Sequence, residues 1–341
     1  MPTPTAEPSS RVAGVAVHLP ERLRSSREVE QTVAAASPAF APTPGIVERL
    51  TGIRWRHVLP ADWQASDLAV AAARKVLANT GTGTDQVDLL LFGSASQDLM
   101  EPATAHLVAA KLGVGCPVMD VKNACNSLLN AIQVADALIA TGQHQRVLVV
   151  TGETPSRAIR WRVAGAAQFA ESFPGYTLSD GGAALMLEPS DGAAGIVGRA
   201  FAADSRAWAV GTLPGGGSAH PRDPEYSYFR ADGARLVEAF QALGDGLLQA
   251  TLANSGLDWD DLAVVCVHQV AMSYLARLVR ATGIPPDRLV LTLPEHGNLA
   301  SVTLALQLAD AIEQGRCGPG DLVALIGLAG GVSLGMLLVR L

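Results

Sequence analysis

Three residues of this chain carry the functional groups that acyl-transfer chemistry requires: Cys125, His268 and Asn298. A cysteine thiolate attacks a thioester and takes the acyl group onto its own sulfur. Imidazole and carboxamide N–H groups donate hydrogen bonds to a carbonyl oxygen as that oxygen becomes negatively charged. The backbone amides of Cys125 and Gly330 are predicted to hold a second such oxygen, because glycine permits a close approach.

The pattern around these residues places each of them at the end of a predicted strand or the beginning of a predicted helix. Cys125 stands just before a helical pattern. The partial positive charge of a helix N-terminus favours a thiolate, so we expect a lowered thiol pKa. His268 directly follows an apolar strand, and Asn298 stands just before a second helical pattern. Ligands gather at such positions in layered α/β proteins.

An internal repeat predicts how the three residues meet. Segments of the first half recur in the second half in the same order, about 175 residues later, for example 77–81 as 252–256 and 147–152 as 322–327. Each half is predicted to read helix, strand, helix, strand, with helices at 67–79, 127–140, 233–254 and 301–313 and strands at 89–92, 147–152, 263–267 and 322–327.

The repeat divides the chain into an N-terminal half, 11–190, and a C-terminal half, 191–341, related by a pseudo-twofold axis in a layered α/β sandwich. Such an axis would bring Cys125 and Asn298 face to face, with His268 on the rim. The first half carries an apolar insertion, 153–180, which is either a lid, an oligomer contact or a surface excursion without a role. A second irregular stretch, 211–228, is predicted to be a loop.

Composition excludes several classes of protein. The 341 residues include 25 Lys plus Arg and 32 Asp plus Glu, for a formal net charge of −7, and 49% are hydrophobic. The acidic balance, without any run of basic residues, argues against nucleic-acid binding. A chain this long and apolar buries a large core, which excludes disorder for the bulk of it.

Local patterns predict a cytoplasmic protein. The four cysteines show no CxxC spacing, and residues 1–10 lack the regions of a signal peptide, so we expect a short disordered lead. The uncharged stretch 322–339 is interrupted by glycines, which favours two buried strands over a membrane span. The remaining histidines show no metal-ligand spacing and no phosphate-binding loop occurs, so we expect neither a metal nor a nucleotide cofactor. Three cysteines are interpreted as buried apolar residues: Cys116, Cys266 and Cys317.

Six motifs together resemble the ketoacyl synthase III branch of the thiolase superfamily over nearly the whole chain. The resemblance implies a duplicated five-layer αβαβα sandwich of the thiolase type, a homodimer, and a Cys-His-Asn active site made of Cys125, His268 and Asn298. It also implies an acyl thioester of coenzyme A or of a carrier protein as substrate, with no permanently bound cofactor. The motifs lie at 50–57, 120–125, 179–183, 267–270, 296–298 and 329–335.

The segment that begins at Glu101 departs from the chain-initiating synthases, which usually have a phenylalanine before Pro102. A glutamate at this place resembles the head-to-head condensing enzymes of olefin biosynthesis and some natural-product acyltransferases. In the condensing enzymes that glutamate acts across the dimer as a base. A base is needed when an α-proton must be removed without loss of CO₂, and a desolvated pocket would raise the pKa of the carboxyl. The alternative for Glu101 is an exposed loop carboxylate.

Two other departures concern the donor. The arginine that many members use for carrier docking is absent from the stretch 271–273, and the tryptophan that stacks on the coenzyme A base is absent from 45–50. No residues are therefore assigned to cofactor or donor binding.

The sequence thus predicts a cytoplasmic, homodimeric acyltransferase of lipid or natural-product biosynthesis. Cys125 would take an acyl group from a thioester, and a second substrate would then accept it, most simply by Claisen-type carbon–carbon bond formation. The alternative is transfer to a hydroxyl or amine of a small molecule, which gives an ester or an amide. A non-catalytic subunit with a thiolase fold and a thioester hydrolase are further alternatives.

Overall fold

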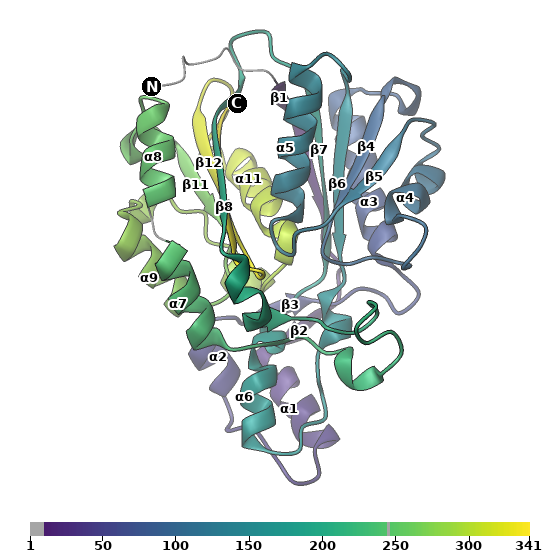
Figure 1. Ribbon diagram of the computed structural model, residues 1–341, viewed down its shortest axis with the longest axis vertical. Coiled ribbons are helices and arrows are strands. Elements are labelled where there is room, and N and C mark those ends of the chain that lie inside the picture. The colour runs from purple at the N-terminus through teal and green to yellow at the C-terminus, as the bar shows by residue number, and fades with distance from the viewer. Residues whose placement is uncertain (1–9, 244–245) are drawn as a thin grey trace.

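Two β-sheets form the centre of the structure, a computed structural model that describes residues 10–243 and 246–341 (Figure 1). The first has the strand order β1-β7-β6-β4-β5, and the second has the order β11-β12-β13-β8. The first consists of β1 (Ser10–His18), β4 (Leu89–Gly93), β5 (Val118–Val121), β6 (Val147–Glu153) and β7 (Gly181–Pro189). The second consists of β8 (Gly195–Ala203), β11 (Val264–Val267), β12 (Leu322–Ala329) and β13 (Ser333–Arg340).

Helices lie between the two sheets and on both outer faces, which gives the predicted αβαβα order of layers (Figure 1). Strands β4, β5 and β6 are parallel, as are β11 and β12, so their carboxyl ends meet helix N-termini at one edge of each sheet. The outer helices are α3 (Ala65–Thr80) and α4 (Thr104–Leu112) on the first sheet and α7 (Gly233–Leu243), α8 (Gly246–Asn254) and α9 (Met272–Thr282) on the second; α5 (Ser127–Ala140) and α11 (Thr303–Glu313) lie between the sheets.

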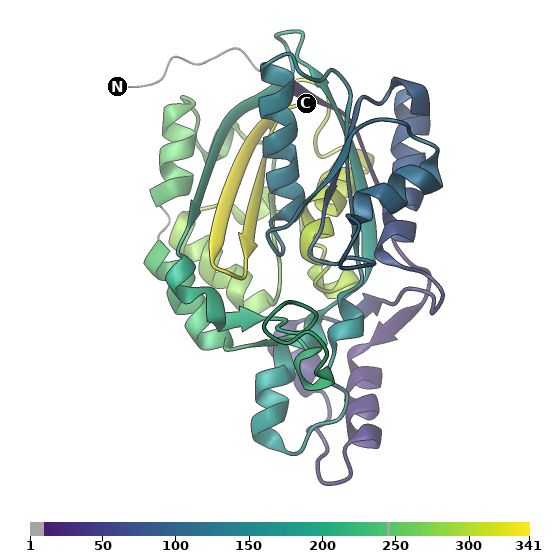
Figure 2. The ribbon, with the colours of Figure 1, turned by 45° about the vertical axis from the view of Figure 1, so that its right-hand side comes forward.

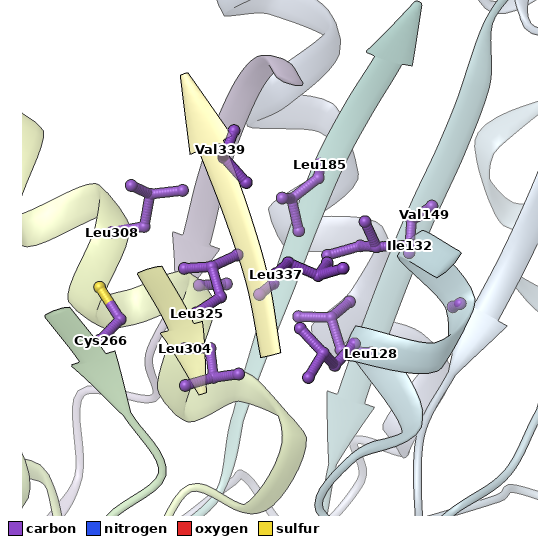
Figure 3. Close-up of a cluster of buried hydrophobic side chains, with 14 of the residues drawn as sticks. Leu128, Ile132, Val149, Leu185, Cys266, Leu304, Leu308, Leu325, Leu337 and Val339 are labelled. Carbon is purple, nitrogen blue, oxygen red and sulfur yellow. The ribbon is translucent and has the colours of Figure 1, made fainter. Parts of the chain in front are cut away.

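The two central helices are apolar on more than one face because a sheet covers each side of them. Their leucine and isoleucine side chains fill the space between the sheets (Figure 3). Each fully buried leucine stabilises the fold by about 1.5–3 kcal/mol relative to an exposed one. This core fixes α5 and α11, and Cys125 and Asn298 lie in the turns that precede these two helices. Its members include Leu128 and Ile132 of α5, Leu304 and Leu308 of α11, and Leu185, Leu325 and Leu337 of the sheets.

Helix α3 packs directly on β6 and β7 because two glycines leave room for its backbone. A Cβ atom on Gly152 would overlap the carbonyl oxygen of Ala65, and one on Gly182 would overlap that of Leu68. We expect Gly152→Ala to lower the free energy of unfolding by about 3 kcal/mol, since a helix would have to move off the sheet.

Urea denaturation of the purified variant measures this loss. Gly115→Ala is the matched control, because a Cβ there meets open space and its backbone φ is not positive. Equal urea midpoints for the Gly152 and Gly115 variants would contradict the packing argument.

A smaller lobe lies at one end of the sandwich and contains the predicted insertion, 153–180 (Figures 1 and 2). The insertion is not a surface excursion, because its buried Tyr176 and Ile159 pack with Val29 and Val33 of the first helix. The lobe consists of β2 (Leu23–Ser25), α1 (Ser26–Ala36), α2 (Ile46–Thr51), β3 (Trp55–His57), the short helix α6 (Ala166–Ser172) and two 3-10 turns, Pro155–Ala158 and Phe173–Thr177; α10 (Leu293–His296) packs against β3.

Three local predictions differ from the structure. The helix predicted over 233–254 appears as α7 and α8, with 244–245 outside the described residues. The helix predicted from residue 301 begins with a 3-10 turn, Ala300–Val302, before α11. The stretch predicted as a loop, 211–228, contains a short strand, β9 (Gly211–Thr212), that pairs with β10 (Arg230–Ala231), and a 3-10 turn, Pro224–Tyr226. The predicted disordered lead, 1–10, lies outside the described residues except for Ser10.

All four cysteines are free. Cys266 and Cys317 are buried, as predicted, whereas Cys116 is half-buried. The uncharged stretch 322–339 forms the two predicted buried strands, β12 and β13. Across residues 10–243 and 246–341, no helix has both the length and the apolar character that a membrane crossing requires.

Candidate functional site

Cys125 lies in a tight turn between β5 and α5. Ala124, the residue before it, has a φ of 46°, in the left-handed region that L-residues rarely adopt. Asn126 N donates to Asn123 O at 3.0 Å, and Ser127 Oγ donates to Ala124 O at 2.7 Å. The turn therefore holds Cys125 in one conformation directly before the helix begins.

The thiol of Cys125 is harder to ionise than the sequence predicted. Burial, and to a smaller extent the charge of Glu153, raise its pKa to about 12, while its own backbone amide opposes the shift. The prediction of a lowered pKa is therefore wrong for the free chain, because desolvation outweighs the half charge of a helix N-terminus. The thiol rests protonated, and its proton must leave during acylation.

His268 directly follows β11 and is buried. Its side chain is 6% exposed, and its backbone amide donates to Ile326 O at 2.9 Å. Neither ring nitrogen has a hydrogen-bond partner among the described residues. Buried polar groups are normally paired, so an imidazole with two free nitrogens is poised to bind a group from outside the chain. Burial lowers the pKa of His268 to about 4, so the imidazole is neutral near pH 7.

Gln269 fixes the turn that presents His268. Its Nε2 donates to Val290 O at 2.7 Å, and its Oε1 accepts from the backbone amides of Thr292 and Leu293 at 3.2 and 3.1 Å. Sequence reasoning did not single out this residue. The signal was a glutamine two residues after a strand that is apolar throughout, in a segment where a buried polar side chain needs partners.

The side chain of Asn298 is oriented by its own turn. Its Oδ1 accepts from Ala300 N at 3.1 Å, which leaves the Nδ2 group as the outward donor. Nδ2 makes one long contact, 3.3 Å to Thr177 Oγ1. The backbone of Asn298 pairs with the end of the insertion, since its amide donates to Thr177 O and its carbonyl accepts from Ser179 N, both at 2.9 Å. The insertion thus helps to hold Asn298, which the sequence did not predict.

Two histidines support the segment that leads to Asn298. His57 Nε2 and His296 Nδ1 lie 2.9 Å apart, and the Nδ1 of His57 lies 2.6 Å from Pro20 O. Burial lowers the pKa of His296 to about 4. This pair joins β3 to α10 and links two of the sequence motifs.

The surroundings of Cys125, His268 and Gly330 meet on the second sheet. Asn126 Nδ2 donates to Ser333 O at 3.1 Å and to Ser333 Oγ at 2.9 Å, directly beyond the turn that contains Gly330. A Cβ on Gly327 would meet the side chain of Asn126, and the preceding residue of β12 accepts the backbone amide of His268. The structure therefore gathers three of the predicted positions around one end of β12. The contacts that join these positions are made by Asn126, which was not among the residues predicted from the sequence.

Strained backbone conformations occur next to the same predicted site residues. Among the described residues, non-glycine residues with positive φ are Ala124, Ala300 and Val332, with φ values of 46°, 49° and 27°. They stand next to Cys125, near Asn298 and beside the glycine turn. Such conformations cluster at functional sites, where the surrounding structure enforces them.

Glu101 has a different environment from these residues within one chain. It is exposed, in the loop between β4 and α4, and its neighbours Leu99 and Met100 are 49% and 67% exposed. The predicted desolvated pocket is therefore not formed by the isolated chain. The loop itself is well anchored, because Asp120 accepts the backbone amides of Thr104 and of the next residue, both at 2.8 Å.

No group of three or more His, Cys, Asp or Glu side chains is arranged to hold a metal ion within 10–243 and 246–341. The chemistry of the site is that of a thiol, a neutral imidazole and a carboxamide. Such a set forms a covalent acyl intermediate and stabilises a negatively charged oxygen.

The burial of His268 predicts a pH dependence of stability. Its folded pKa of about 4 lies below the unfolded value of 6.5, so the unfolded chain binds more protons as the pH falls below 6.5. The stabilisation that comes from the neutral His268 is therefore complete above pH 6.5 and is lost progressively toward pH 4, by roughly 2 kcal/mol at pH 5.

Urea midpoints between pH 7 and 5 should fall more steeply for the wild type than for His268→Asn. His106→Asn, at an exposed position, is the control, and parallel slopes for all three proteins would contradict the prediction.

Two family models match separate stretches of the chain. Residues 119–205 match the model described as 3-oxoacyl-[acyl-carrier-protein (ACP)] synthase III, and residues 252–341 match the model of its C-terminal part. The curated relatives include a β-ketoacyl-[acyl-carrier-protein] synthase III of Xanthomonas campestris, 31% identical over 97% of this chain and 98% of the relative. A second relative of the same name, from Desulfitobacterium hafniense, is 28% identical over 96% of this chain and 97% of the relative.

Solved structures agree with the fold. A structure of Xanthomonas campestris OleA superimposes with a TM-score of 0.88 at 25% identity, covering 99% of this chain and 100% of that one. The 3-oxoacyl-[acyl-carrier-protein] synthase III of Aquifex aeolicus superimposes with a TM-score of 0.84 at 21% identity, covering 97% and 100%. The OleA structures include variants in which one glutamate, one histidine or one cysteine has been replaced. The thiolase-like fold that the resemblance implied is confirmed.

Proposed function

The chain belongs to the 3-oxoacyl-[acyl-carrier-protein] synthase III family of condensing enzymes, and from that premise we propose that Cys125 is its acyl-carrying nucleophile. In the first step the sulfur of Cys125 attacks the carbonyl carbon of an acyl thioester. The bond to the leaving sulfur breaks, the thiol proton passes to that leaving group, and an acyl-enzyme and a free thiol result. The donor is a thioester of coenzyme A or of a carrier protein.

The second step forms a carbon–carbon bond. Glu101 removes an α-proton from a second acyl thioester, and the resulting enolate attacks the acyl group on Cys125. Collapse of the tetrahedral intermediate releases the Cys125 sulfur, which regains a proton, and a β-keto thioester. His268 and Asn298 donate to the enolate oxygen, and the amides of Cys125 and Gly330 donate to the oxygen of the tetrahedral intermediate.

One observation carries this proposal: the buried imidazole of His268 has no partner among residues 10–243 and 246–341, while the oxygen of Asn298 is already engaged. Both side chains are thereby left as donors. A protein that merely stored these residues in its core would pair them with its own groups.

A second copy of the chain would complete the site around Glu101. Strand β5 is the last strand of the first sheet and carries Met119, which is 42% exposed. An edge strand offers backbone groups for pairing with another chain, and the exposed Leu99 and Met100 lie in the adjoining loop. A homodimer formed through β5 would desolvate the Glu101 loop, which is the environment that a base requires.

The experiment is an incubation of the purified enzyme with acetyl-, hexanoyl- and myristoyl-coenzyme A, each alone, followed by mass spectrometry of protein and products. We expect an acyl adduct on Cys125 and a β-keto product, for which no hydroxyl or amine acceptor is needed. An acylated alcohol or amine in place of a β-keto product would establish the ester or amide alternative, which the condensing relatives do not favour. An acyl adduct on the protein without any product would indicate a subunit that only binds the donor. Release of the free fatty acid as the only product would indicate a thioester hydrolase.

The cytoplasm is the compartment that fits this chemistry. All four cysteines are free thiols, and Cys125 must remain reduced to react.

A further inference from the structure

The carboxyl group of Glu153 is completely buried at the carboxyl end of β6, beside the predicted site. Buried carboxyl groups are rare unless they are paired, and this one has no basic partner among its hydrogen-bond contacts in the described chain. The reaction steps proposed above do not use it. Its position in the fold therefore needs another explanation.

Four donors converge on the two carboxyl oxygens of Glu153. Ala95 N donates to Oε1 at 2.9 Å, and Ser96 donates to Oε2 through its amide at 3.2 Å and its hydroxyl at 2.8 Å. The fourth donor, Ser301 Oγ, donates to Oε1 at 2.5 Å. A carboxylate accepts all four at once, which an amide or a hydroxyl cannot do.

These contacts join the two halves of the chain at the predicted site. Ala95 and Ser96 belong to the loop after β4, whereas Ser301 belongs to the turn that follows Asn298. Ser301 Oγ also lies 2.7 Å from Thr151 Oγ1 of β6. The orientation of Asn298 depends on the same turn, because its Oδ1 accepts from the amide of Ala300.

We propose that Glu153 is a positioning residue of the active site: it fastens the Asn298 turn of the second half to the first half, and it sets a carboxylate charge near Cys125. The inference rests on the proposed function only through the role of Asn298. Charge supports it from a second direction, since Glu153 is among the causes that raise the pKa of the Cys125 thiol. Burial raises the pKa of the Glu153 carboxyl itself, and the hydrogen bonds from Ser301, Ala95 and Ser96 oppose that rise and favour the carboxylate. A thiol beside a carboxylate stays protonated until a substrate binds, which protects it from adventitious alkylation and oxidation.

Two substitutions separate the two effects. Glu153→Gln keeps the size of the side chain and removes its charge, so iodoacetamide should alkylate Cys125 about tenfold faster at a given pH below the thiol pKa. Ser301→Ala leaves the charge and removes the link to the second half, so alkylation should stay as in the wild type while kcat for condensation falls about tenfold or more. Alkylation is followed from pH 7 to 10.5 by peptide mass mapping, which resolves the four cysteines.

Asp136→Asn is the matched control for loss of a buried carboxylate, since Asp136 lies in α5 eleven residues beyond Cys125 and binds Ser10 and Arg199. It should leave the alkylation profile of Cys125 unchanged. Equal alkylation rates for Glu153→Gln and the wild type would overturn the charge effect, and so would a lack of alkylation in both. Wild-type kcat in Ser301→Ala would overturn the positioning effect, and this variant remains informative if Glu153→Gln does not fold. A failure of the proposed function looks different, because the wild type would then form no acyl adduct with any acyl-coenzyme A.

Discussion

Replacement of Cys125 by alanine is expected to abolish both the acyl-enzyme adduct and product formation. The sulfur is the atom that forms the covalent bond, and no other group near it has the same nucleophilicity, so turnover should fall by roughly 10⁴-fold or more. Intact-mass spectrometry after incubation with an acyl-coenzyme A measures the adduct, and a coupled assay for free thiol measures turnover.

The control for this variant is Cys116→Ala, because Cys116 is also half-buried but lies before β5, away from His268 and Asn298. It should acylate and turn over like the wild type. An adduct of undiminished yield in Cys125→Ala would assign the nucleophile to another residue. Unfolding midpoints of both variants should stay close to that of the wild type, since the thiol makes no hydrogen bond that the turn depends on.

Glu101→Gln is expected to separate the two half-reactions. The acyl-enzyme should form at the normal rate, because the first step needs no base at this position, while β-keto product should fall by about 10²- to 10⁴-fold. The substitution is at an exposed position of the single chain and should not alter its folding. Single-turnover acylation, followed by product analysis after addition of the second thioester, measures the two steps separately.

Mixed dimers test whether Glu101 acts on the partner chain. Little product is expected from Cys125→Ala or from Glu101→Gln alone, but a mixed dimer of the two would contain one site with both an intact thiol and an intact carboxylate. After random exchange of subunits, about a quarter of the wild-type activity should return. An inactive mixture, with exchange verified by mass spectrometry, would place the carboxylate in the same chain as the thiol that it serves.

Much of the fold was accessible from the sequence because the chain repeats itself. Segments that recur at one offset have to form equivalent elements, so each weak strand or helix pattern was supported by its counterpart. The helix predicted at 127–140 has those bounds in the structure, and the strand predicted at 147–152 extends by one residue. The family and the thiolase-like fold are confirmed. The roles of Cys125, His268 and Asn298 stay predictions, although the surroundings of Cys125 and His268 do meet at one end of β12.

What the sequence could not predict depends on burial and on contacts between distant segments. The thiol pKa of Cys125 is set by desolvation and by Glu153, and neither is visible from a position before a helix. His268 is buried, and its backbone amide binds Ile326 O of β12, a contact that no pattern near residue 268 indicates. Thr177 and Ser179 bind the backbone of Asn298 across more than a hundred residues, so no local pattern indicates them. For Glu101 the single-chain structure cannot supply the missing contact either, because the loop that contains it is exposed and would be covered only in a dimer.

The left-handed backbone at Ala124 and Ala300 bears on attempts to raise the thermostability of this protein. Glycine adopts such a conformation without the steric cost that alanine bears there. A screen for heat resistance should therefore select Ala124→Gly and Ala300→Gly, each of which should raise the free energy of unfolding by on the order of 1 kcal/mol. The same changes would loosen the turns that hold Cys125 and Asn298. The two substitutions should therefore raise heat resistance and lower the catalytic rate, so stabilising substitutions are better sought at other positions of the chain.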